Sequence, residues 1–127
     1  MNKRPGVLPA VLVSAAFLGA IGLTVANGYL PPLILYIYLG CNVVAFIAYA
    51  IDKAAAQRGL WRISEKTLHL FALAGGWPGA WIAQQSFRHK TKKAEFRSVF
   101  RVTVVANCIA LAYLYTSAGQ AWLDRML

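Results

Sequence analysis

The densest group of chemically active side chains is the basic run at 88–93, which reads RHKTKK. Arginine can hold a phosphate through paired hydrogen bonds, lysine adds positive charge, and threonine can add a hydroxyl donor. On a helix that begins within this run, Lys93, Arg97 and Arg101 would share one face at i, i+4 and i+8. The predicted anion-binding site comprises Arg88, His89, Lys90, Thr91, Lys93 and Arg97. The alternative interpretation is a topological anchor that only meets anionic lipid at the membrane surface.

A second group of charged side chains lies between residues 52 and 66. Asp52 directly follows an apolar stretch, where a lone carboxylate is costly unless it is paired. It could act as a general base or an ion-coupling carboxylate, or it could form a salt bridge with the basic run. We interpret this group as a charge network that ties the polar segments together, with the members Asp52, Lys53, Arg62 and Glu65.

Metal and cofactor chemistry are not indicated by the remaining polar residues. His69 and His89 could come together, but the sequence offers no evident third ligand. Cys41 and Cys108 each lie inside an apolar block and are interpreted as small hydrophobic side chains. Because there is also no P-loop and no dinucleotide-binding glycine motif, we predict neither a metal nor a cofactor.

Long apolar blocks must position these groups. The chain has 127 residues, of which 59% are hydrophobic and only 13% charged, whereas an ordinary soluble domain is about 25% charged. The uncharged blocks at 7–26 and 30–51 have the length of about 20 residues that a membrane-spanning helix needs, and a third span is predicted at 102–122. The composition therefore indicates one integral membrane domain over 1–127 and excludes a disulfide scaffold or a disordered tail.

The apolar block at 67–87 is unusual, because its centre has the sequence GGWPG. These residues are Gly75, Gly76, Trp77, Pro78 and Gly79. One interpretation is a re-entrant hairpin that turns at this sequence, with arms that reach about halfway across a ~30 Å hydrocarbon core. The other is a fourth spanning helix kinked at Pro78, whose small residues would allow close helix packing.

The distribution of charge favours the hairpin. Thirteen Lys and Arg residues stand against four Asp and Glu, and basic residues collect on the cytoplasmic side of membrane proteins. A spanning 67–87 block would place seven basic residues on one side and six on the other, whereas a hairpin would leave Arg125 alone outside. We therefore predict an all-α membrane protein with three transmembrane helices plus a re-entrant, or Pro-kinked fourth, segment. The loops 52–66 and 88–101 and the N-terminus would be cytoplasmic.

Several motifs together resemble a known family. They are Tyr49 with Asp52-Lys53-Ala54, the run WRISEKTL at 61–68, the GGWPG sequence, and RHKTKK followed by Phe96. Over residues 33–100, this combination resembles domain-of-unknown-function family 1294, a family of bacterial membrane proteins. Ser64 stands where members have proline, and both residues suit the start of a helix. The resemblance implies a small, multi-pass inner-membrane protein, and cold-shock domains in some members imply a link to single-stranded nucleic acid.

The leading prediction for function is a non-enzymatic binding or scaffold protein. Its basic cytoplasmic face would hold an anionic partner, either a lipid headgroup or RNA in a ribonucleoprotein. One alternative is an enzyme acting on a phosphate-bearing membrane lipid, with Asp52 or Glu65 as the base. Another is a small transporter, which would have to form a homo-oligomer because the chain is short.

Overall fold

The computed structural model describes residues 6–59, 63–87 and 94–127, and the regular elements in these ranges are helical. In chain order they are α1 (Val7–Ala26), α2 (Pro32–Arg58), α3 (Glu65–Phe71), the short irregular segment η1 (Ala72–Gly76), α4 (Trp77–Phe87), α5 (Ala94–Leu114) and α6 (Ser117–Met126). Three of them, α1, α2 and α5, are long and apolar enough to cross a membrane. The predicted all-α class, with three such helices and further helical segments, is confirmed.

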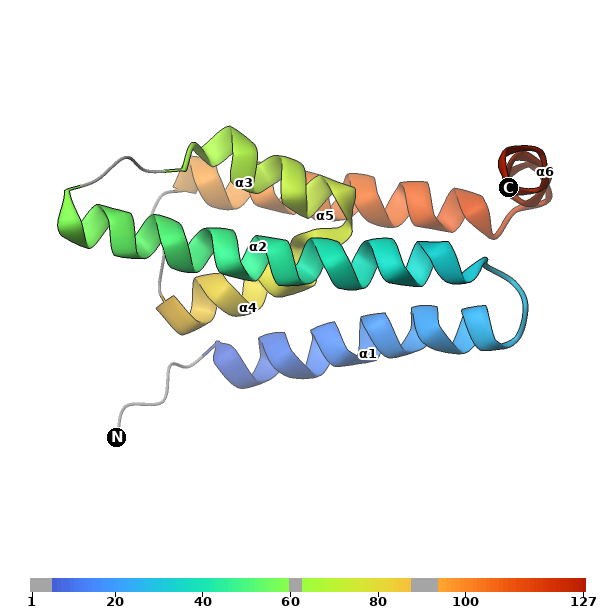
Figure 1. Cartoon of the computed structure of the whole chain (residues 1–127), viewed down its shortest axis with the longest axis horizontal. Helices are drawn as coiled ribbons and strands as arrows, with labels where there is room; N and C mark the ends of the chain where they lie inside the picture. The colour runs from blue at the N-terminus through green and yellow to red at the C-terminus, as the bar shows by residue number, and fades with distance from the viewer. Residues whose placement is uncertain (1–5, 60–62, 88–93) are drawn as a thin grey trace.

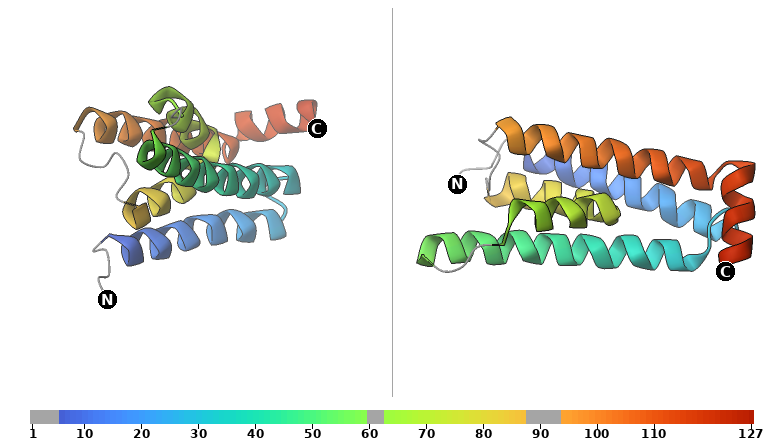
Figure 2. Two further views of the ribbon diagram at one scale, coloured as in Figure 1. Left: turned by 60° about the vertical axis from the view of Figure 1, so that its left-hand side comes forward. Right: turned by 90° about the horizontal axis from the view of Figure 1, so that it is seen from above.

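The long helices lie roughly along one axis (Figure 1). α1 and α2 are antiparallel neighbours, and α5 runs in the same direction as α1 (Figures 1 and 2). α6 crosses the end of the bundle at which α1 connects to α2, nearly at right angles to the long helices (Figure 2). We call this the far end, since the remaining helices, α3 and α4, lie toward the opposite end.

α3, η1 and α4 form a helical hairpin beside α2. Both ends of the hairpin contact the C-terminal part of α2: the Ile63 N–H donates to Asp52 Oδ1 at 2.8 Å, and Lys53 Nζ donates to the last carbonyl of α4. The turn lies further back along α2, where Asn42 Nδ2 donates to the Gly75 carbonyl at 3.1 Å. At 1.5 Å per residue, the hairpin therefore extends about 15 Å along α2. Figure 2 shows the two arms returning to the same end.

Three helix boundaries differ from those predicted. α2 continues past Asp52 to Arg58 and ends at Gly59, whose φ is 66°. α5 begins at Ala94, inside the predicted loop at 88–101, because charged side chains on the exposed face of a helix do not stop it. The predicted span at 102–122 is divided between two helices. Thr116 starts α6 by accepting a hydrogen bond from the Gly119 N–H at 3.1 Å, which separates α6 from α5.

The buried core consists of two clusters. The first surrounds the hairpin and comprises Ala45, Ala48, Tyr49, Leu68, Ala72, Trp77, Ala80, Ala83, Phe96 and Phe100. The second lies toward the far end and comprises Ile21, Leu30, Tyr38, Leu111 and Leu123. Small residues on the hairpin let its backbone approach α1 and α2 closely, as in other tightly packed membrane helices. We refer to the regions around these clusters as the hairpin half and the far half.

Candidate functional site

The chain reverses direction at Gly75. Its φ of 124° lies in a region that glycine adopts readily and other residues rarely do. Of the five residues predicted to form the turn, only Gly75 departs from helical geometry, because Trp77, Pro78 and Gly79 already belong to α4. Pro78 lies in the first turn of α4, where backbone N–H groups have no intrahelical partner. A proline there therefore does not break a helical hydrogen bond. The reversal is thus at Gly75 and not at the proline.

Asn42 of α2 holds the turn from one side. Its Nδ2 donates to the carbonyls of Tyr38, at 2.6 Å, and Gly75, at 3.1 Å, and its Oδ1 accepts from the Gly79 N–H at 2.5 Å. The Gly75 carbonyl and the Gly79 N–H lie at ends of helical segments, where backbone groups lack intrahelical partners. A Cβ on Gly79 would overlap the backbone of Asn42, so glycine is needed there for this close approach.

Asn107 of α5 holds the turn from the opposite side. Its Nδ2 donates to the Leu73 carbonyl at 2.9 Å. Its Oδ1 accepts from the Tyr38 hydroxyl at 2.9 Å and from Trp77 Nε1 at 3.2 Å. Ser14 of α1 adds a hydrogen bond from its hydroxyl to the Pro78 carbonyl at 3.3 Å. The three long helices therefore supply the polar partners that an irregular backbone needs inside an apolar bundle.

The open end of the hairpin is held by the neighbouring charged residues. Asp52 is fully buried in α2 and accepts the Ile63 N–H just ahead of α3. Lys53 binds the Phe87 carbonyl at the end of α4. Glu65 lies in the first turn of α3, which Ser64 caps by accepting a hydrogen bond from the Thr67 N–H at 3.2 Å. Asp52 and Lys53 thus each connect α2 to one end of the hairpin, whereas Arg62 lies outside the described residues.

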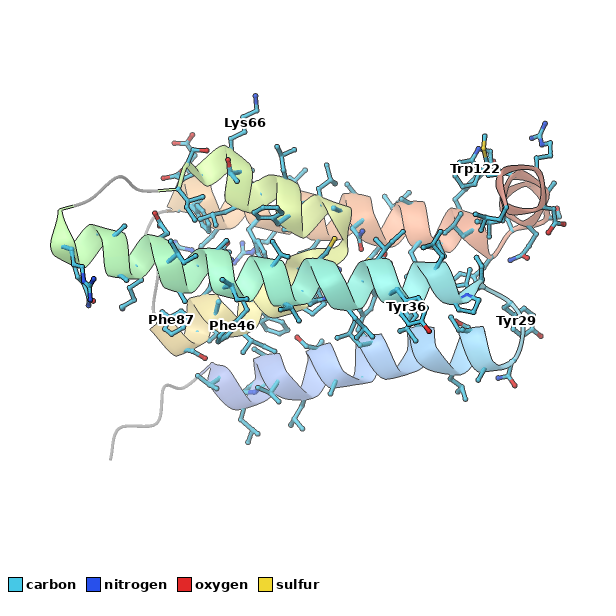
Figure 3. The ribbon with its side chains drawn as sticks, in the orientation of Figure 1. Tyr29, Tyr36, Phe46, Lys66, Phe87 and Trp122 are labelled. Carbon is cyan, nitrogen blue, oxygen red and sulfur yellow. The ribbon has the colours of Figure 1, made fainter. Side chains whose placement is uncertain are left out.

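The predicted anion-binding residues are only partly described. Arg97 lies exposed on the first two turns of α5, and Arg88, His89, Lys90, Thr91 and Lys93 lie outside the described residues. Five of the six described basic side chains nevertheless belong to the hairpin half. We use the term basic end for the end of the bundle that carries these five side chains, which are Lys53, Arg58, Lys66, Arg97 and Arg101. Lys66 points away from the bundle (Figure 3). The sixth residue, Arg125, lies on α6 at the far end.

Two of the cavities are lined in part by the arms of the hairpin. The smaller, of about 350 Å³, lies between α3 and α5, beside His69, whose ring packs on Phe96 with centroids 4.5 Å apart. No group of three or more His, Cys, Asp or Glu within the described ranges could hold a metal. The larger cavity, of about 670 Å³, is a groove lined by α4, α5 and Val13 of α1. Arg97 and Arg101 both line this groove. Their i, i+4 spacing was the only feature of the sequence that pointed to it.

The fold and these contacts define a small all-helical protein with three potential membrane spans and a buried polar hairpin. The family described as "Protein of unknown function (DUF1294)" matches residues 42–96, which run from the asparagine that holds the turn to the start of α5. The uncharacterised protein YsdA of Bacillus subtilis (strain 168) is 41% identical over 75 residues, covering 59% of this chain and 84% of that protein. The chain therefore belongs to this family, as the motifs indicated. No solved structure matches it.

Proposed function

We propose that this chain is an inner-membrane protein whose hairpin re-enters the bilayer from the cytoplasmic side and whose basic end binds anionic phospholipid headgroups. The observation that carries the proposal is that both ends of the hairpin lie in the half of the bundle with five of the six described basic residues. Basic residues concentrate on the cytoplasmic side of membrane proteins, where the leaflet is anionic.

The orientation follows from the order of the helices. If the hairpin enters and leaves on one side, α1 begins on that side, α2 ends there, and α5 begins there. Every Lys and Arg except Arg125 then falls on the side of the N-terminus. This arrangement gives a cytoplasmic N-terminus and places α6 at the outer surface.

The depth of the turn supports a re-entrant arrangement. α1 has 20 residues, which corresponds to about 30 Å at 1.5 Å per residue. Ser14, whose hydroxyl donates to the Pro78 carbonyl just after the turn, lies seven residues after the start of α1 at Val7. The turn would therefore lie about 10 Å into the hydrocarbon layer. Its backbone is satisfied by Asn42, Asn107 and Ser14, as membrane depth requires.

The surroundings of the arginines favour a lipid over RNA as the anionic partner. Arg97 and Arg101 project from a helix whose neighbouring exposed residues include Val99, Val102 and Val105. An RNA backbone would bind a water-exposed basic surface, whereas an arginine within an apolar surface can extend its head to the phosphate level of a bilayer. Arginine also binds phosphate oxygens in pairs.

The proposal can be tested with protein in nanodiscs of mixed phosphatidylglycerol and phosphatidylcholine. Native mass spectrometry would count the lipids of each kind that remain bound to the protein on release from the disc. Arg101→Gln should lower retained phosphatidylglycerol about fivefold, the effect of about 1 kcal/mol for one basic residue near the surface. The matched control, Arg125→Gln, should change little.

Two outcomes would contradict this function. Equal retention of phosphatidylglycerol and phosphatidylcholine by the unaltered protein would show that the basic end does not select an anion. RNA that copurifies, is released steeply with salt and depends on Arg97 and Arg101 would identify a nucleic acid as the partner instead.

A further inference from the structure

The groove in the hairpin half exists because α4 and α5 pack on different neighbours. α4 packs mainly on α1 and α2, whereas α5 packs on η1, α3 and α6. Side chains of α4 and α5 are left facing each other across a space of about 670 Å³. That volume is in the range of about 300–1,000 Å³ found for pockets that hold small molecules.

The α5 wall of the groove changes in character along its length. Arg97 and Arg101 are one turn apart on the same side of the helix, toward the basic end. The next turn contributes Val104 and Val105, which lie toward the turn of the hairpin. Of the described residues that line the groove, none is acidic. This wall is therefore cationic at one end and apolar at the other.

The α4 wall follows the same gradient. Trp77 is nearly buried near the turn, where its indole N–H is bonded to Asn107. Trp81 lies one turn further along α4 and is half-buried. Gln84 and Gln85 follow toward the end of the helix, and the Gln84 amide donates to the Tyr49 hydroxyl at 3.0 Å. The apolar end is thus formed by indole rings and valines, and the other end by amides and arginines.

We infer that this groove holds one anionic phospholipid molecule, with its phosphate at Arg97 and Arg101 and one acyl chain between Trp81 and Val104. The inference deepens the proposed function and rests on it, because it requires the basic end to lie at the headgroup level. Charge complementarity selects the occupant. An anionic head joined to an apolar chain matches the gradient along both walls, whereas an apolar helix from another protein would complement only the apolar end.

The test fills the groove without changing its charge. Val105→Trp would put an indole into the groove from a position that is 57% exposed, so the helix itself should tolerate it. Val102→Trp is the matched control, because Val102 is 66% exposed on the same helix and lies outside the groove. It lines a neighbouring hollow together with Val105, so it also controls for an indole placed on that side of the helix. Native mass spectrometry would measure retention of phosphatidylglycerol, and a phosphatidylglycerol with a diazirine near the end of its acyl chain would identify the residues it contacts.

We expect Val105→Trp to lower retention of a single tightly bound phosphatidylglycerol about tenfold, the effect of excluding about two methylene groups. Val102→Trp should leave it unchanged, and the diazirine should label Trp77, Trp81 or Val13. If Val105→Trp retains the lipid fully while Arg101→Gln loses it, the groove is not the site, and the headgroup proposal stands alone. If phosphatidylcholine labels the groove equally, this inference is overturned, whereas the headgroup proposal falls only if the unaltered protein also retains the two lipids equally. Labelling confined to the contact surface of a second copy of the chain would also overturn the groove as a lipid site.

Discussion

The hairpin half buries polar side chains, whereas the far half buries mainly apolar ones. Around the hairpin, most buried polar side chains bind backbone groups, and these are Ser14, Asn42, Asp52, Thr103 and Asn107. Buried Gln84 donates to the Tyr49 hydroxyl instead. In the far half the core is mostly aliphatic, and the contact between Thr24 and the Tyr115 hydroxyl, 3.0 Å long, is exposed. The two halves are built from the same long helices, so the hairpin itself accounts for the difference.

The difference shows what a chain reversal inside an apolar bundle requires. A continuous helix satisfies its own backbone, but the turn at Gly75 leaves carbonyl and N–H groups that need partners from other helices. Three long helices each supply one such partner near the turn. Polar burial is thus the cost of the hairpin, and it also fixes the position of the hairpin, since a displaced turn would lose these bonds.

The largest effect we expect is in cysteine labelling, where the two ends of the bundle should be accessible only from opposite sides of the membrane. Cysteines placed at Gln57 and Ser98, both exposed, should be labelled by an impermeant reagent from the cytoplasmic side. A cysteine at Ala118 of α6 should be labelled only from outside. The background would carry Cys41→Ala and Cys108→Ala, because the chain contains these free cysteines. Labelling of positions 57 and 98 from opposite sides of intact cells would rule out a re-entrant hairpin.

The next effect concerns the close approach of the hairpin to α2. Gly79→Val should destabilise the protein by about 3 kcal/mol or more, because the added side chain would overlap the Asn42 backbone. Gly19→Val is the control, since a Cβ there meets nothing within 4 Å. The yield of monodisperse protein and the midpoint of thermal unfolding would measure both variants. Equal tolerance at the two positions would mean that the hairpin does not pack on α2 as the structure shows.

A smaller loss should follow from removing one polar partner of the turn. Asn107→Leu would deprive the Tyr38 hydroxyl, the Trp77 indole and the Leu73 carbonyl of their shared partner, at a cost of about 2 kcal/mol. In the far half, Thr24→Val removes the exposed contact with the Tyr115 hydroxyl and the hydrogen bond to the Ile21 carbonyl of the same helix. The Ile21 carbonyl is an intrahelical backbone group, so the free energy of unfolding should change by less than about 0.5 kcal/mol. Unfolding in SDS, followed by tryptophan fluorescence, gives both values. If Thr24→Val lowered the free energy of unfolding more than Asn107→Leu, the polar contacts at the turn would not be the more important ones.

The apolar blocks were sufficient to predict the fold class, and the block at 7–26 coincides with α1. Helix ends were harder to predict, because α2 and α5 both contain charged residues, which a hydropathy pattern assigns to loops. In α2 the first of them, Asp52, is buried inside the helix bundle. The break between α5 and α6 was missed for a related reason. Thr116 and Gly119 are too ordinary in a sequence to mark a helix start before the capping geometry is known.

The partners within the site could not be derived from sequence order. Asn42 and Asn107 could be recognised as polar residues within apolar blocks, but their meeting at one turn depends on how far the hairpin extends along α2. Gly75 could be located only within a group of three glycines, because its positive φ depends on where the chain reverses. The groove was missed because its walls come from α4 and α5, which are separated in the sequence by the basic run.

The last prediction asks whether the basic residues of the hairpin half do more than orient the protein. Arg88 begins the basic run directly after α4, and an arginine there could bind a phosphate in a forked geometry that lysine cannot reproduce. Arg88→Lys should therefore weaken retention of phosphatidylglycerol by about 1–2 kcal/mol, the scale of one charged hydrogen bond. Lys92→Arg should have no effect, because the i, i+4, i+8 spacing in the sequence groups Lys93 with Arg97 and Arg101 and leaves Lys92 out. Arg125→Lys, in the far half, should also leave the retention of phosphatidylglycerol unchanged. If Arg88→Lys retains the lipid fully, positive charge alone explains the basic run, and specific anion recognition would have to come from Arg97 and Arg101.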